Sequence, residues 1–239
     1  PVRVARLTDD AERASRGGWV FDADKPDPVF GAADLREVYD YLAGGRGAHR
    51  GRCTAPLLVD RRRKTVVSAE SADIVELLDG MEGGNSVTLR PAGLERELAA
   101  LNESLYQGLN NAVYRAGFAT SQAAYDRAYD DVRRTLRELD ARLAESRFLL
   151  GGKVTEADVR AFPTVVRFDA VYAPLFKCAG TAVSELPRLR AWMQDFYLLP
   201  GVAGTVDVDG YRSSYFGQLF PLNPGGIVPA GPTAEDLGL

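Results

Sequence analysis

The sequence is poor in the residues from which metal centres and histidine relays are built. It contains one histidine, His49, and two cysteines, Cys53 and Cys178, with no Cys-x-x-Cys pair and no Cys/His cluster. Zinc sites depend mainly on these residue types, so we expect no metal centre. A catalytic relay would have to use His49, which lies in a Gly- and Arg-rich stretch and is a poor candidate.

Long apolar runs are also lacking. No run approaches the roughly 20 residues needed to span a bilayer, and residues 1–13 lack the apolar core of an export signal. The formal net charge of -4 disfavours nucleic acid and anionic membranes as partners, because both are bound by basic surfaces. We therefore expect a cytoplasmic protein with reduced cysteines.

The first part of the chain mixes strand and helix patterns. In order, the patterns predict a strand over 2–7, a helix over 33–43, a hairpin of a buried strand over 56–60 with one over 65–68, and a helix capped by Ser71. The residues of that last helix expected to face inward are Ile74, Val75, Leu77 and Leu78. A Gly-containing linker over 81–86 follows.

Beyond the linker the patterns are almost wholly helical. The expected helices cover 94–114, 121–144, a segment from Thr155 through Pro163, and 186–199, before an irregular tail over 221–239. Thr155 and Asp158 have the spacing of a capping box. The sequence therefore predicts two domains: an α+β, thioredoxin-like domain over 1–85 and an all-α helical bundle over 86–239.

One candidate site lies in the first domain. A cis-proline at Pro56 would present the backbone of Ala55 to an extended thiol peptide. Fourteen residues later, Glu70 and Ser71 open a helix, whose N-terminus can bind a carboxylate while Glu70 accepts an ammonium group. The spacing alone is equally compatible with an ordinary edge proline and an ordinary capped helix.

A second candidate site is a set of tyrosines in the helical half, namely Tyr114, Tyr172 and Tyr215. A phenol can donate a proton or a hydrogen bond to a developing oxyanion in an apolar pocket. Core packing with a satisfied hydroxyl is the alternative for each of them.

Several ordered segments resemble one family, the Xi-class glutathione transferases or glutathionyl-hydroquinone reductases. The similarity runs from about Val2 to Pro232. The matching segments are 18–21, 55–60, 70–71, 110–125, 166–172, 176–178 and 223–232.

The resemblance implies a glutathione-transferase fold, a homodimer, and a reaction that removes glutathione from S-glutathionyl-hydroquinones. The products are the hydroquinone and glutathione disulfide, with glutathione as co-substrate and no metal. The residues that match the family's thiol-binding positions are Trp19, Ala55, Pro56, Glu70 and Ser71. Those that match its tyrosines around the quinol are Tyr114, Tyr172 and Tyr215.

The sequence departs from the family in two places. The family's nucleophilic cysteine motif, of Cys-Pro-Trp-Ala type, is absent, as are the first strand and helix of the thioredoxin-like domain. We expect an N-terminal segment to supply them, in preference to a truncated, inactive relative. Cys53, three residues before Pro56, is a weaker candidate nucleophile. The second departure is Phe216, which stands where the family has a second tyrosine.

Two alternatives stay open. The same chemistry could use mycothiol, which has no γ-glutamyl group, although Glu70 and Ser71 favour glutathione. The chain could also be a catalytically inactive binding protein that keeps the transferase fold. Turnover of a glutathionyl-quinol distinguishes an enzyme from a binding protein.

Overall fold

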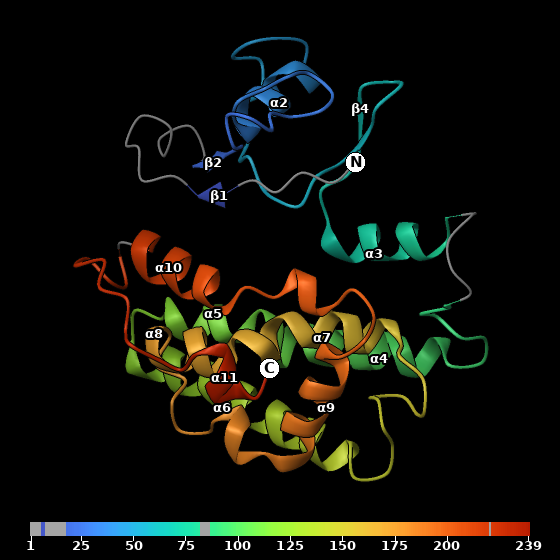
Figure 1. Cartoon of the computed structure of the whole chain (residues 1–239), viewed down its shortest axis with the longest axis vertical. Helices are drawn as coiled ribbons and strands as arrows, with labels where there is room; N and C mark the ends of the chain where they lie inside the picture. The colour runs from blue at the N-terminus through green and yellow to red at the C-terminus, as the bar shows by residue number, and fades with distance from the viewer. Residues whose placement is uncertain (1–5, 8–17, 82–86, 220) are drawn as a thin grey trace. The chain divides into compact units, whose positions relative to one another are not determined.

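The computed structural model describes residues 6–7, 18–81, 87–219 and 221–239. The chain divides into two compact units, Pro1–Asn85 and Ser86–Leu239 (Figure 1).

The first unit contains two small antiparallel sheets among its described residues. Strand β1 (Arg6–Leu7) pairs with β2 (Trp19–Val20), and β3 (Leu58–Asp60) pairs with β4 (Thr65–Ser68). The hairpin predicted over 56–68 is confirmed, but β3 is half-buried rather than buried. Of the strand predicted over 2–7, residues 2–5 lie outside the described residues. Strand β2 was not predicted.

Helix α2 (Leu35–Leu42) confirms the helix predicted over 33–43. Its N-cap is Asp34, whose carboxylate accepts a hydrogen bond from the backbone N–H of Glu37 at 2.8 Å. The apolar face of α2 forms a small core. The buried members of this core are Ala32, Leu35, Val38, Tyr39 and Cys53, with Trp19, Phe21, Phe30, Leu42 and Leu57 packed against them.

Helix α3 (Ser71–Asp79) forms where predicted, but two details differ. Glu70, not Ser71, occupies the N-cap position, and its side chain makes no capping hydrogen bond. The prediction of an inward apolar face is wrong, because α3 has no buried residue and Leu77 and Leu78 are 45% and 54% exposed. Helical periodicity predicts an apolar face but not what covers it.

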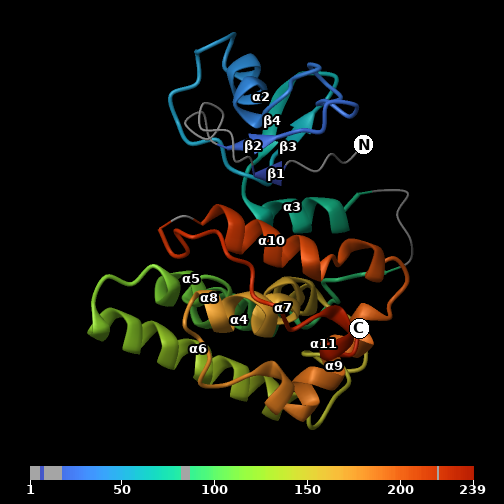
Figure 2. The same cartoon turned by 60° about the vertical axis from the view of Figure 1, so that its left-hand side comes forward.

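The second unit is a helical bundle (Figures 1 and 2). Its α-helices are α4 (Glu95–Leu105), α5 (Ala112–Gly117), α6 (Gln122–Arg142), α7 (Glu156–Arg167), α8 (Ala173–Leu175), α9 (Pro187–Tyr197), α10 (Val208–Gln218) and α11 (Ala234–Leu237). Short 3₁₀ turns η3 (Val183–Glu185) and η4 (Ala203–Thr205) connect some of them. The predicted helices over 121–144 and 186–199 are confirmed as α6 and α9.

Two π-helical segments interrupt the expected regular helices. The segment η1 (Tyr106–Asn110) separates α4 from α5, so the single helix predicted over 94–114 is wrong. The segment η2 (Phe168–Tyr172) continues α7, which itself runs through Pro163. A Cβ on Gly108 would overlap the side chain of Thr135, so α6 approaches η1 closely there. The close contact between α6 and η1 joins residues far apart in the sequence, so the local helical pattern did not predict it.

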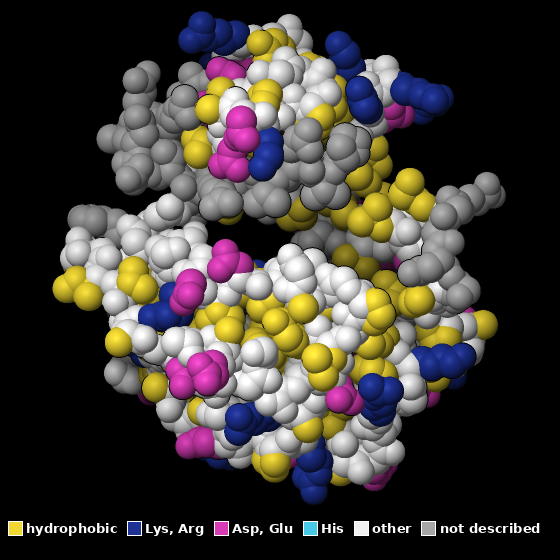
Figure 3. All heavy atoms as spheres, in the orientation of Figure 1, with side chains coloured by type: hydrophobic (Ala, Val, Ile, Leu, Met, Phe, Trp, Pro, Cys, Tyr) yellow, Lys and Arg dark blue, Asp and Glu magenta, His cyan; other side chains and the backbone are white. Residues whose placement is uncertain are grey.

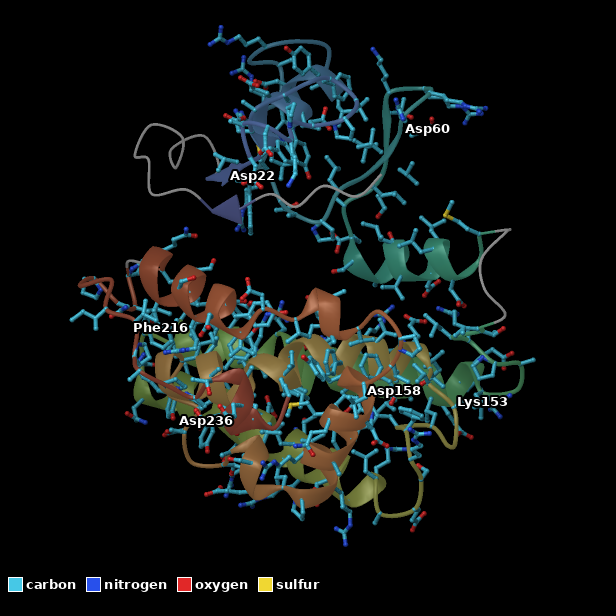
Figure 4. All side chains as sticks on the ribbon, viewed as in Figure 1. Asp22, Asp60, Lys153, Asp158, Phe216 and Asp236 are labelled. Atoms are coloured by element: carbon cyan, nitrogen blue, oxygen red, sulfur yellow. The ribbon has the colours of Figure 1, made fainter. Side chains whose placement is uncertain are left out.

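The capping box at the start of α7 is confirmed. The Oδ2 atom of Asp158 accepts hydrogen bonds from the backbone N–H and the hydroxyl of Thr155, both at 2.9 Å. Asp158 is fully buried in the bundle (Figure 4). Its Oδ1 atom accepts from the backbone N–H of Leu149 and the indole Nε1 of Trp192, each at 2.9 Å.

The C-terminal part holds an 11-residue helix that was not predicted, α10 (Figures 1 and 2), which contacts η2. Asp207 caps its start by accepting from the N–H of Gly210 at 2.8 Å. The described part of the tail is irregular, as predicted, apart from the four-residue α11. Charged side chains of both signs are interspersed on the face of the molecule seen in Figure 3.

Candidate functional site

The three tyrosines singled out in the helical half lie together. The hydroxyl of Tyr114 is 2.6 Å from that of Tyr215 and 3.4 Å from that of Tyr172, and the Tyr172 and Tyr215 hydroxyls are 3.2 Å apart. We call this group the tyrosine trio. Three phenols in one cluster supply three O–H donors at one place.

Each member comes from a different element. Tyr114 lies on α5, directly after η1, and Tyr172 is the last residue of η2. Tyr215 lies on α10, which contacts η2. The trio therefore depends on both π-helical segments and on the helix that the sequence did not predict. π-helical segments occur frequently at functional sites.

Phe176 forms the apolar floor of the trio. Its ring centroid is 5.2 Å from that of Tyr114, 5.3 Å from that of Tyr172 and 6.2 Å from that of Tyr215, and the residue has no exposed surface. Phe176 belongs to a segment that was quoted for the resemblance, but no role was predicted for it. Its spacing of four residues from Tyr172, one helical turn, was the available signal.

Burial differs within the trio. Tyr172 is 4% exposed and Tyr114 is 37% exposed, and Tyr215 is half-buried. Burial raises the pKa of Tyr172 and of Tyr114 far above the ordinary phenol value. Both neighbouring phenols raise the pKa of Tyr172 further, whereas for Tyr114 the effect of Tyr215 raises the pKa and the hydrogen bond with Tyr172 lowers it. Both hydroxyls are therefore protonated at neutral pH and act as hydrogen-bond donors.

The five residues with predicted thiol-binding roles all lie in the first unit. The Ala55–Pro56 peptide bond is cis, as expected from the resemblance. Trp19 is half-buried and packs against the small core around α2. Glu70 and Ser71 are exposed at the start of α3, and the backbone N–H of Glu70 donates to the hydroxyl of Ser68 at 3.0 Å.

Both cysteines are buried. Cys178 has no exposed surface, and burial raises the pKa of its thiol to about 12. Cys53 is 7% exposed in the core around α2, where its sulfur accepts a hydrogen bond from Arg36 Nη1 at 3.5 Å. A catalytic thiolate needs access to its substrate, which these positions deny.

Within the described ranges, no group of three or more His, Cys, Asp or Glu side chains is placed to hold a metal ion. Among the same residues, no helix combines the length and apolar character required to cross a membrane.

Residues 122–195 match the family described as "Glutathione S-transferase, C-terminal domain". The chain is 37% identical over 219 residues to the glutathionyl-hydroquinone reductase YqjG of Escherichia coli, covering 90% of this chain and 67% of that protein. It is 36% identical over 228 residues to the glutathionyl-hydroquinone reductase PcpF of Sphingobium chlorophenolicum, with coverages of 93% and 72%.

Comparison with solved structures indicates the same family. The glutathione-bound structure of YqjG superposes with a TM-score of 0.85 at 37% identity, covering 91% of this chain and 72% of that one. A Xi-class transferase from Natrialba magadii gives 0.88 at 35% identity, with coverages of 97% and 70%. The fold is that of the glutathione transferases. Within them, this chain belongs to the Xi class, the family of the glutathionyl-hydroquinone reductases.

Proposed function

We propose that the protein is an enzyme that removes glutathione from S-glutathionyl-hydroquinones. The main structural observation that supports this proposal is the tyrosine trio, whose three hydroxyls lie within 2.6–3.4 Å of one another beside Phe176. The membership of the chain in the reductase family supports the same reaction. The glutathione-bound structure of YqjG supports glutathione as the thiol.

In the proposed reaction, a thiolate attacks the sulfur of the glutathionyl adduct. The adduct reacts as its keto tautomer, in which the carbon that carries sulfur also carries a hydrogen and lies next to a ring carbonyl. The carbon–sulfur bond breaks, its electron pair passes through the ring carbon to the carbonyl oxygen, and that oxygen takes a proton to give the hydroquinone. A sulfur–sulfur bond forms with the attacking cysteine. A second glutathione then attacks this mixed disulfide and leaves as glutathione disulfide, which regenerates the cysteine.

The trio's role in this reaction is to donate hydrogen bonds to a quinol oxygen. As the ring takes up the electron pair, negative charge develops on that oxygen, and O–H donors already in place stabilise it. Because the raised pKa values of Tyr114 and Tyr172 make these phenols poor acids, we assign them hydrogen-bond donation rather than full proton transfer.

The thiol-binding part of the proposal rests on the first unit. The backbone of Ala55, before the cis Pro56, would pair with the thiol peptide, with Trp19 against it. Glu70 and Ser71 would hold the γ-glutamyl group at the start of α3, where helix N–H groups favour a carboxylate. Mycothiol, which lacks that group, is the alternative thiol.

Since Cys53 and Cys178 are both buried, we propose that the attacking thiolate comes from sequence N-terminal to Pro1. Intact mass of the purified native protein tests this. A mass several kilodaltons above the 25.9 kDa of this chain supports it. A mass equal to that of this chain would instead favour a binding protein without a nucleophile. We also propose that the protein is a homodimer, which light scattering tests. We propose that it is cytoplasmic, which cell fractionation tests.

The deciding experiment is turnover of an S-glutathionyl-hydroquinone by the native protein, with hydroquinone and glutathione disulfide both quantified. Tyr172→Phe and Tyr114→Phe should each lower kcat about 10²-fold, the effect of removing one oxyanion donor. Tyr129→Phe is the matched control. The Tyr129 hydroxyl is buried without a hydrogen-bond partner among the described residues and lies outside the trio.

Glutathione binding without any turnover in the wild-type protein would contradict the enzymatic proposal and support the inactive binding protein. Parallel calorimetry with glutathione and with mycothiol identifies the thiol. Glu70→Gln should weaken binding of glutathione more than binding of mycothiol, since only glutathione has the γ-glutamyl ammonium that Glu70 would accept.

A further inference from the structure

Arg167 lies between η2 and α10, two of the elements that carry the tyrosine trio. Arg167 is the last residue of α7, immediately before η2, and it is half-buried. Its Nη1 atom donates to the backbone carbonyl of Pro163 at 2.6 Å, one turn earlier. Arg167 therefore satisfies a backbone carbonyl close to the point where α7 ends and η2 begins.

The Arg167 guanidinium also contacts α10. Its Cζ atom lies 3.7 Å from the ring centroid of Tyr211 on α10, a close cation–π contact. Tyr211 precedes Tyr215 by four residues, so both side chains project from the same face of α10. The Tyr211 hydroxyl donates to the carbonyl of Thr205 at 2.9 Å, which fixes the ring under the guanidinium.

We propose that Arg167 and Tyr211 form a clamp that positions the tyrosine trio. The clamp joins the start of η2, which ends in Tyr172, to the turn of α10 that precedes Tyr215. Arg167 is thus a positioning residue that sets the separation of the Tyr172 and Tyr215 hydroxyls. In its absence, α10 would be free to shift relative to η2.

Electrostatics supports this placement. Arg167 acts on Tyr114 by lowering its pKa, against the larger effect of burial that raises it. The cation is therefore close enough to influence the trio as well as to anchor its backbone. This contact was not predictable from sequence patterns, because Arg167 and Tyr211 are 44 positions apart and arginine is common along the chain.

The test measures the trio directly by NMR of protein labelled with ¹³C at tyrosine Cζ, whose shift reports hydrogen bonding of the phenol. Arg167→Met and Tyr211→Leu should each move the Tyr172 and Tyr215 signals, and the double variant should move them no further than either single variant. Tyr211→Phe keeps the ring but loses the hydroxyl bond to Thr205, so it should move the signals less than Tyr211→Leu does.

The matched control is Arg147→Met. Arg147 also lies over an aromatic ring, with its Cζ atom 5.2 Å from the centroid of Phe148, and pairs with Asp195 at 3.0 Å. It lies outside the trio, so its replacement should leave the three signals unchanged. If Arg167→Met proves unfolded by circular dichroism, Arg167→Lys, which keeps the charge and the alkyl stem without the planar group, is measured instead.

Unchanged trio signals in folded Arg167→Met and Tyr211→Leu would overturn the clamp, as would additive shifts in the double variant. The clamp also rests on the proposed function in one respect. With a glutathionyl-hydroquinone as substrate, Arg167→Met should lower kcat about tenfold with little change in KM. If the signals move but the wild-type protein shows no turnover, the clamp stands and the proposed reaction fails.

Discussion

The buried carboxylate of Asp158 and the indole of Trp192 are joined by a 2.9 Å hydrogen bond between α7 and α9. Together with Thr155 and Leu149, this bond gives the carboxylate four donors inside the bundle. Asp158 therefore closes the start of α7 and ties it to the neighbouring helix.

Replacing Asp158 by Ala should lower the free energy of unfolding by about 3–4 kcal/mol, because it leaves several buried donors without a partner. Urea unfolding followed by circular dichroism measures this. The control is Asp130→Ala, whose side chain is 63% exposed and pairs with Arg133 on the surface. That change should cost less than about 1 kcal/mol. Equal losses in both variants would contradict the assigned role of Asp158.

Stability should fall with rising pH above about 10. The pKa values of Tyr172 and Tyr114 are raised in the folded protein above the ordinary value of about 10, so the folded state keeps protons that the unfolded state releases. The contribution is fully present below pH 10 and is lost above it. Each such phenol lowers the free energy of unfolding by up to about 1.4 kcal/mol per pH unit there.

Urea unfolding at a series of pH values from 9 to 11 measures this slope. Tyr172→Phe removes one of the two groups and should reduce the slope. An unchanged slope in that variant would mean that Tyr172 does not hold its proton more tightly in the folded state.

Cys178 should resist alkylation in the folded protein. With its pKa raised to about 12 by burial, its thiolate fraction at pH 8 is about a thousandfold lower than for a thiol with the ordinary value near 9. Iodoacetamide labelling, followed by mass spectrometry of the peptide that contains Cys178, reports this thiol separately from any other. Rapid labelling without denaturant would contradict the burial, while labelling in 8 M urea is the positive control.

Gly117→Ala should disturb the floor of the trio. A Cβ at this position would lie 2.5 Å from Cγ of Phe176, so the ring must move. Overpacking of this kind costs about 1–3 kcal/mol, and the Tyr172 and Tyr215 signals should shift with the ring.

The matched control for this change is Gly217→Ala on α10. No heavy atom lies within 4 Å of a Cβ there, so the added methyl group should stabilise the helix slightly, by about 0.5–1 kcal/mol. If Gly117→Ala proves as stable as Gly217→Ala, the close approach to Phe176 is wrong.

Local sequence signals were enough for part of the fold. Helix α6 has regular apolar spacing and a serine cap, since the hydroxyl of Ser121 accepts from the N–H of Ala124 at 3.3 Å. The capping box of Thr155 and Asp158 is equally local. Both features are fixed by residues within a few positions of one another, which is the range over which sequence patterns carry information.

Features that depend on distant neighbours were not predictable from the sequence. Helix α10 contains two Gly, two Ser and the β-branched Val208, all of low helix propensity, and it forms in contact with η2. The burial of α3 was overestimated for a related reason, because its apolar spacing said nothing about its neighbours. For the trio, the resemblance selected the three tyrosines, but spacing alone did not separate them from ordinary core residues.

The segment η1 has a consequence for how this chain tolerates changes in length. A π-helical turn is equivalent to one residue inserted into an α-helix, and one residue turns a helix by about 100°. Deleting a single residue from Tyr106–Asn110 would allow α4 and α5 to join as one regular helix. Because the wider π-helical turn takes up the extra residue without turning the following helix by that 100°, the face that carries Tyr114 would keep its direction, and the three hydroxyls would stay together in the shorter chain.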